Sequence, residues 1–220
     1  MSSEQKVPVS TSDFEVDPRL EQLRKTHLID NVRISLTSLA LFCGFAVVGT
    51  SGDTLAVYNA THLSSDFHLP LWPDQFDLRP TIALVVGGVV VVFANAVSLL
   101  SSKVKVLRGY TATHSALTFL APFVGFVAVM ISMVFFYAVN ASITADTVQS
   151  WSCRWGYTSM DRRPYFGTLC KESQTALYLS VVLVPIELII LTVAGYQMTM
   201  ERKASKLIPT IHKSSSPALS

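Results

Sequence analysis

Glu187 has the clearest potential for chemistry in this sequence, because it is an acid within a long apolar segment. A carboxylate at the centre of a bilayer costs about 2.5–3.5 kcal/mol, so we expect Glu187 to face other protein segments or to be protonated. One interpretation is a proton or cation relay, or a fixed contact with a partner subunit. The other is an interhelical hydrogen bond, with Asn95 of a second apolar segment as the obvious partner. We favour the hydrogen bond, because a single intramembrane acid makes a poor transport pathway.

Cys153 and Cys170 lie in polar sequence, where a disulfide can form if the loop faces an oxidising compartment. Closing this loop would stabilise the fold by about 3 kcal/mol on the chain-entropy estimate. The loop also holds aromatic and arginine side chains, which are enriched in binding hot spots. They can equally serve only to anchor the protein at the membrane interface. The partner-binding candidates are Trp151, Trp155, Arg162 and Arg163.

Motifs for enzymatic chemistry do not occur in the sequence. It contains no glycine-rich phosphate-binding loop, no G-x-S-x-G and no H-E-x-x-H. The five histidines are scattered, and His62 and His68, which share a loop, have no nearby cysteine or ordered acid pair to complete a metal site. The net charge is only +2, which argues against a nucleic-acid partner. We therefore expect a protein that is not an enzyme and that binds no cofactor, metal or nucleic acid.

Four apolar segments must position these residues. Half of the chain is hydrophobic and only 15% is charged, a balance typical of membrane proteins. About 20 apolar residues are enough to cross a hydrocarbon core of about 30 Å. The segments that qualify are residues 34–50, with an extension toward Tyr58 left open, 81–100, 117–139 and 176–196. The predicted fold class is an all-α membrane protein, in which residues 34–200 form an antiparallel four-helix transmembrane bundle with a disulfide-closed outer loop.

The distribution of positive charge predicts the orientation of these segments. Twelve lysines and arginines lie in residues 1–33, in the loop 103–114 and after residue 200, against five in residues 51–80 and 140–175. Because cytoplasmic loops carry the excess, both termini are predicted to be cytoplasmic. The N-glycosylation sequons at Asn59 and Asn140 then lie in the outer loops. Asn59 is the better candidate for glycosylation, since Asn140 adjoins the third segment.

The two polar flanks are residues 1–33 and 201–220. Asp17 followed by Pro18 is typical of a helix start. The residues that follow form either a short helix at the inner membrane surface or a solvated extension of the first span, and both interpretations remain open. The basic tail 201–220 is predicted to be disordered.

The layout of the chain resembles that of MARVEL-type tetraspan proteins, which organise membrane domains and vesicle traffic. The resemblance covers residues 34–200 and rests on four spans, cytoplasmic ends, a short inner loop and a cysteine pair in the second outer loop. It includes no diagnostic motif, and no functional residue carries over. The claudin-like group is a poor match, because its W-x-x-W and cysteine pair lie in the first outer loop.

The sequence thus predicts a non-enzymatic integral membrane protein of the plasma membrane or secretory pathway. We expect it to organise membrane domains or protein traffic through lateral and outer-loop contacts with membrane-protein partners or with copies of itself. The alternative is a small transporter or channel accessory subunit that uses Glu187 and Asn95. The two hypotheses differ in what Glu187 does.

Overall fold

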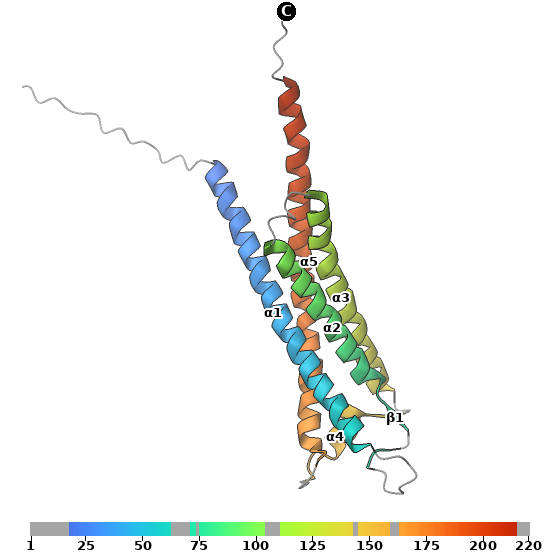
Figure 1. Ribbon diagram of the computed structural model, residues 1–220. Coiled ribbons are helices and arrows are strands. Elements are labelled where there is room, and N and C mark those ends of the chain that lie inside the picture. Colours follow the sequence, from blue (N-terminus) through green and yellow to red (C-terminus); the bar gives the residue numbers. More distant parts are fainter. Residues whose placement is uncertain are drawn as a thin grey trace, which may run out of the picture.

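The computed structural model describes residues 18–62, 71–73, 75–103, 111–142, 145–158 and 163–214. Figure 1 shows four long helices side by side, with the short elements gathered at one end. We call this end the disulfide end, and the opposite end, where α1 begins and α5 finishes, the terminal end. The elements are α1 (Pro18–Thr61), β1 (Phe76–Asp77), α2 (Arg79–Lys103), α3 (Thr111–Ala141), β2 (Asp146–Thr147), α4 (Val148–Arg154) and α5 (Phe166–Ser214).

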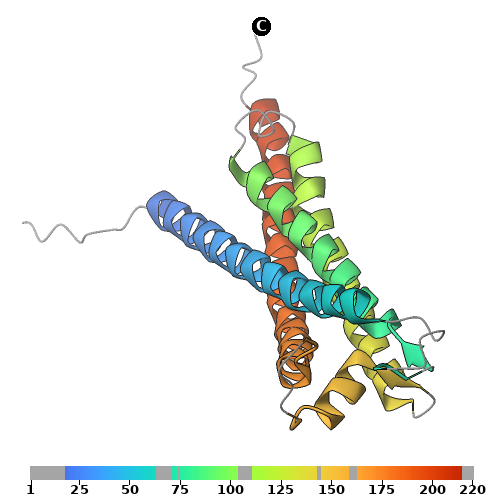
Figure 2. The same cartoon turned by 60° about the horizontal axis from the view of Figure 1, so that its bottom comes forward.

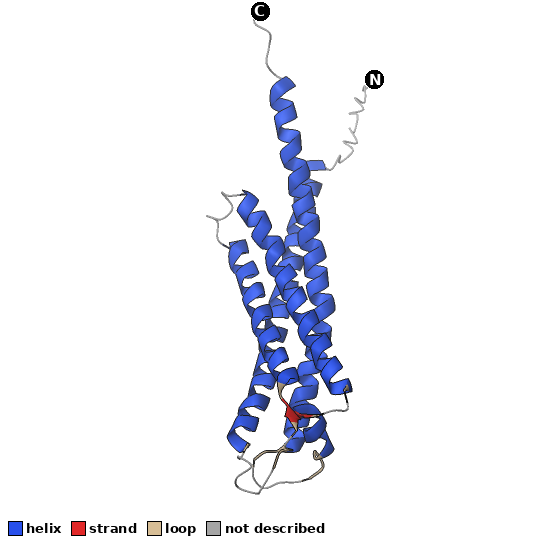
Figure 3. Ribbon diagram, turned by 90° about the vertical axis from the view of Figure 1, so that its right-hand side faces the viewer, coloured by secondary structure: helices blue, strands red, loops and turns tan. Residues whose placement is uncertain are grey.

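Helices α1, α2, α3 and α5 are each long and apolar enough to cross a membrane, which confirms the four apolar segments predicted from the sequence. Two of them are far longer than predicted, since α1 has 44 residues and α5 has 49. Both extend beyond α2 and α3 at the terminal end (Figure 3).

These long helices correct two expectations about the flanks. Helix α1 is continuous from Pro18, so residues 18–33 extend the first span and form no separate interfacial helix. The tail predicted to be disordered from residue 201 is helical as far as Ser214. The good helix formers Glu201 to Ala204 follow the apolar segment without a glycine or proline, so nothing ends the helix there. Residues 1–17 and 215–220 lie outside the described part of the chain.

The helices pack in a ring, in which α2 and α5 each contact both α1 and α3. A Cβ placed on Gly87 would lie 2.7 Å from the Cβ of Ser132 in α3, and one on Gly88 would lie 2.8 Å from Cγ2 of Val48 in α1. The adjacent glycines therefore let α2 approach α3 and α1 closely, as small residues do between membrane helices. The core between the helices includes Ala40, Val47, Leu84, Val91, Val129, Phe136, Leu183 and Ile190.

The disulfide end is covered by β1, β2 and α4, which we call the cap (Figure 2). Strand β1 pairs in parallel with β2, and so joins the segment that follows α1 to the segment that follows α3. Helix α4 starts with a capping box, in which Thr147 and Ser150 bond reciprocally to each other's backbone N–H. Beneath it lies a buried cluster of Tyr58, Trp72, Phe166 and Leu169.

Candidate functional site

An acid–amide pair is buried between the long helices. Glu187 of α5 is fully buried, and Asn95 of α2 is 2% exposed. The Nδ2 atom of Asn95 donates hydrogen bonds to Oε1 of Glu187 at 2.6 Å and to the carbonyl of Val91 at 3.0 Å. The interhelical hydrogen bond suggested by the sequence is therefore present.

Gly125 of α3 forms the third side of this site. A Cβ at that position would lie 3.2 Å from Oε2 of Glu187 and 3.3 Å from Oε1, so the carboxyl group packs directly against the α3 backbone. Oε2 is buried and has no hydrogen-bond partner among the described residues. The carboxyl group thus lies between three helices, with one oxygen bonded and the other in apolar surroundings. No sequence pattern reveals that Gly125 is the residue of α3 that lies opposite Glu187.

Three other buried hydroxyl groups of the bundle bond within their own helices. Thr37 donates to the carbonyl of Arg33, Ser132 to that of Val129 and Ser180 to that of Leu177. These bonds connect no second helix to the pair of Glu187 and Asn95. They therefore provide no chain of polar groups that leads from the pair to either end of the bundle.

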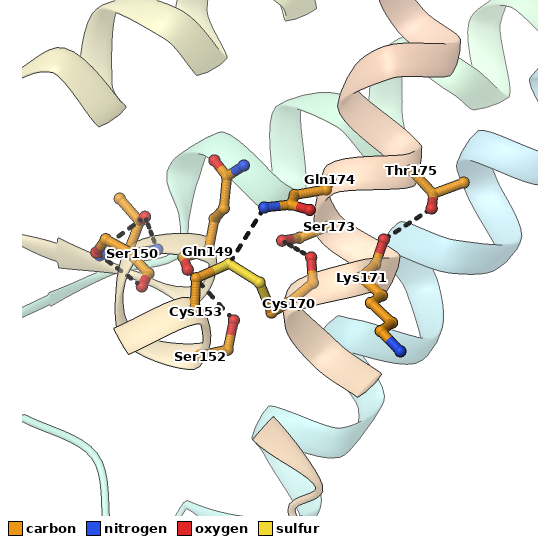
Figure 4. Close-up of a disulfide and its surroundings, with 10 residues drawn as sticks. Gln149, Ser150, Ser152, Cys153, Cys170, Lys171, Ser173, Gln174 and Thr175 are labelled. Carbon is orange, nitrogen blue, oxygen red and sulfur yellow. Dashed lines mark hydrogen bonds between the residues drawn. A yellow bond between two sulfur atoms is a disulfide. The ribbon is translucent and has the colours of Figure 1, made fainter. Parts of the chain in front are cut away.

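The predicted disulfide is present between Cys153 of α4 and Cys170 in the first turns of α5, with Cα atoms 4.8 Å apart. Figure 4 shows Gln174 pointing at this bond, and its Nε2 lies 3.7 Å from Sγ of Cys153. The neighbouring Ser173 and Thr175 bond back to carbonyls of their own helix. The disulfide therefore fixes α4, and with it the rest of the cap, to the end of α5.

The four partner-binding candidates separate into different environments. Trp155 is 46% exposed and Arg163 is also exposed, whereas Trp151 is half-buried and packs against the aromatic cluster under the cap. Arg162 lies outside the described residues. Tyr157 and Tyr165, which were not among the four, are 99% and 49% exposed.

Arg154 lies beside Trp151, one of the two tryptophans at α4. Its guanidinium group pairs with Asp146 at 3.2 Å and lies 5.9 Å from the centre of the Trp151 ring. The Trp151 and Trp155 rings are 5.8 Å apart. Trp151 and Trp155 are four residues apart and share one helix face. Only Trp151 is covered by the aromatic cluster.

The two sequons differ in how accessible their asparagines are. Nδ2 of Asn140 donates to the carbonyl of Phe136, and Oδ1 accepts a hydrogen bond from Thr147 at 2.5 Å. Both ends of this amide are therefore occupied, and the bond from Thr147 joins α3 to the cap. Asn59 is exposed near the end of α1. Glycosylation of Asn59 stays a prediction, and the folded structure disfavours it at Asn140.

Glu172 of α5 is a second acid with an unsatisfied oxygen. Its Oε2 is buried and makes no hydrogen bond with the described residues. Asp53 of α1 is close enough to repel it electrostatically. These two acids lie near the disulfide end, with Asp53 three residues after the predicted segment 34–50 and Glu172 four residues before 176–196.

No protein-family model, no curated protein and no solved structure matches this chain. The function must therefore be inferred from the geometry itself. Among the described residues, no group of histidines, cysteines and acids is arranged to hold a metal ion.

Proposed function

We propose that this protein crosses the membrane four times as an antiparallel bundle and acts without catalysis, by holding neighbouring membrane proteins through its cap and its helix faces. The membrane position is supported by large apolar side chains that point outward along all four long helices, where water would disfavour them. Examples from each helix are Phe42, Phe93, Ile131 and Ile189.

Tyrosines on α5 agree with the thickness of a bilayer. Tyr178 and Tyr196 are both exposed, and their positions differ by 18 residues. At 1.5 Å per residue this separation is about 27 Å, close to the thickness of a hydrocarbon core of about 30 Å. Tyrosines favour the two interfaces of a bilayer. Arg33 of α1, which bonds to Gln197 of α5, then lies at the interface of the terminal end.

The excess of lysine and arginine at the terminal end supports a cytoplasmic location for both termini. The cap then faces the outside of the cell or the lumen of the secretory pathway, where a disulfide persists. This arrangement keeps the layout that resembles the MARVEL-type proteins.

The observation that carries the proposal is the set of exposed aromatic side chains on and beside the cap. Trp155, Tyr157 and Tyr165 lie close in sequence to the two ends of the disulfide, which fixes their backbone. Aromatic side chains on a rigid support lose little conformational entropy when they bind. We therefore expect this surface to contact the part of a partner membrane protein that lies outside the bilayer.

Proximity labelling in intact cells, from a tag on the C-terminus, tests the proposal. The variant with Trp155→Ala and Tyr157→Ala should lose a defined set of membrane neighbours that the wild type labels. Tyr196→Ala, which removes an exposed tyrosine at the opposite end, is the matched control and should keep that set. If both variants label the same neighbours as the wild type, the cap is not the contact surface.

One observation favours the alternative, a transporter or channel accessory subunit. Oε2 of Glu187 is buried without a hydrogen-bond partner among the described residues, as expected of a group that exchanges a ligand. Under this alternative, Glu187→Gln abolishes pH-dependent flux in reconstituted vesicles. Flux no greater than that of empty vesicles would exclude it.

A further inference from the structure

Glu187 lacks any positive charge to balance a carboxylate. The apolar segments 34–50, 81–100, 117–139 and 176–196 contain no lysine, arginine or histidine. The two residues that neighbouring helices place against it are neutral: Asn95 of α2 and Gly125 of α3. An ionised carboxylate in such surroundings is far more costly than a neutral group with one unmade hydrogen bond.

The site also has little room for a ligand larger than a proton. The space beside the carboxyl group is filled by the α3 backbone, since even a Cβ on Gly125 would be within 3.3 Å of both oxygens. A metal ion or a water molecule would need several polar partners. Asn95 is the one hydrogen-bond partner that Glu187 has among the described residues.

We propose that Glu187 is a proton-binding site, and that packing of α3 against α5 at Gly125 holds the proton in place. In this state Oε1 accepts the hydrogen bond from Asn95, and Oε2 carries the proton. The proton leaves only when α3 and α5 separate far enough for water to reach Oε2. Protonation of Glu187 and contact between the two helices are thereby coupled. This inference does not rest on the proposed role of the cap.

Infrared spectroscopy of the full-length protein in lipid vesicles tests the protonation state. At pH 7, the difference between the wild-type spectrum and that of Glu187→Gln should contain the C=O stretch of one protonated carboxylic acid. Carboxylate stretches in its place would overturn the proposal. If the variant does not fold, Glu172→Gln protein with ¹³C-labelled glutamate carboxyls decides the question, because Glu172 is the other described glutamate with a buried, unbonded oxygen. The protonated band must then be present at pH 7 and must vanish on unfolding.

Exchange of the bound proton in D₂O tests the coupling to helix packing. The protonated band of the wild type should shift slowly, because the site is closed to water. Gly125→Ala places a methyl group against the carboxyl group and should make the shift faster by about tenfold or more, which corresponds to about 1.4 kcal/mol in favour of the open arrangement.

Gly49→Ala is the matched control, since a Cβ at Gly49 has no neighbour within 4 Å, and its exchange should match that of the wild type. Equal exchange rates in the wild type and Gly125→Ala would show that α3 does not hold the proton. Loss of labelled neighbours in the Trp155→Ala, Tyr157→Ala variant is a separate result, and neither outcome decides the other.

Discussion

The cap and the centre of the bundle each contain a bond that joins two helices, but the surroundings of the two bonds differ. In the cap, the disulfide of Cys153 and Cys170 adjoins a cluster of stacked and edge-on aromatic rings. In the bundle, the hydrogen bond from Asn95 to Glu187 is surrounded by aliphatic side chains and close-packed glycines. The cap is stabilised by a covalent bond and by burial of aromatic surface away from water. The bundle is stabilised by close packing of its helices.

In the proposed membrane arrangement, this difference follows from the two solvents that surround the cap and the bundle. Outside the bilayer, burial of aromatic surface removes it from water and contributes the full hydrophobic effect. Within the bilayer, lipid tails are as apolar as leucine, so helices gain only from close packing and from a few polar contacts. Substitutions in the cap should therefore change stability more than substitutions in the bundle do. The expected order of effects provides a series of tests.

Trp72→Ala should have the largest effect. Trp72 is buried, its ring contacts those of Tyr58, Phe76 and Phe166, and its Nε1 donates to Thr61. Removing a buried tryptophan typically costs about 3–5 kcal/mol. We expect a loss of this size in the free energy of unfolding, measured by circular dichroism in detergent micelles. The exposed Trp155→Ala should change it by only about 0.5 kcal/mol or less. Similar losses for both would show that the cluster does not hold the cap.

Replacement of both disulfide cysteines by serine should cost about 3 kcal/mol. The loss should be confined to the cap, so the fluorescence of Trp151 should indicate greater exposure while the helix content of the four long helices stays unchanged. A reducing agent should reproduce the effect in the wild type and in the Cys43→Ser control, since Cys43 is free. Loss of helix content together with the cap would show that the two regions unfold as one.

Much of this architecture could be predicted from the sequence. Long apolar segments dictate helices wherever their backbone must satisfy its own hydrogen bonds. The disulfide followed from two cysteines in one polar loop, and the Glu187 partner followed from the scarcity of polar residues in the other apolar segments. In each case one rare residue type left few alternatives.

Other features depend on packing that sequence patterns do not encode. The pairing of the two-residue strands β1 and β2 joins segments separated by about a third of the chain. Trp151 and Trp155 look equivalent in sequence, but only the first is covered by the aromatic cluster. Helices α1 and α5 extend beyond the predicted apolar segments in both directions. Hydropathy marks the apolar part of a helix and does not indicate where the helix begins or ends.

Gly87→Ala should destabilise the bundle by about 1–3 kcal/mol, the usual cost of an overpacked core. The added methyl group would clash with Ser132 and push α2 away from α3. Gly49→Ala has open space around the new methyl group and should stabilise α1 by up to about 1 kcal/mol, because alanine favours a helix more than glycine does. Thermal unfolding of both variants in the same micelles provides the measurement. A stabilising Gly87→Ala would contradict the close packing of α2 and α3.

Asn95→Leu should cost about 0.6–2 kcal/mol, the range measured for interhelical hydrogen bonds within membranes. The leucine removes the donor to Oε1 of Glu187 but fills a similar volume. A cost well above this range, measured in the same unfolding assay, would mean that Glu187 is ionised and that the hydrogen bond from Asn95 had stabilised its charge. This measurement therefore also tests the proton-binding site.

Glu172→Gln should have the smallest effect and the opposite sign. It removes the cost of burying the Glu172 carboxylate and also its repulsion by Asp53 of α1, and interactions between partly exposed charges contribute about 0.2–1 kcal/mol. Asp53→Asn should stabilise the protein by a smaller amount, because it removes the repulsion alone. The double variant should gain no more than Glu172→Gln does, and this non-additivity is the measurement that assigns the repulsion to the pair. Additive gains would mean that each acid is destabilised by its own surroundings. The boundary between water and bilayer would then lie closer to the cap than the exposed tyrosines of α5 indicate.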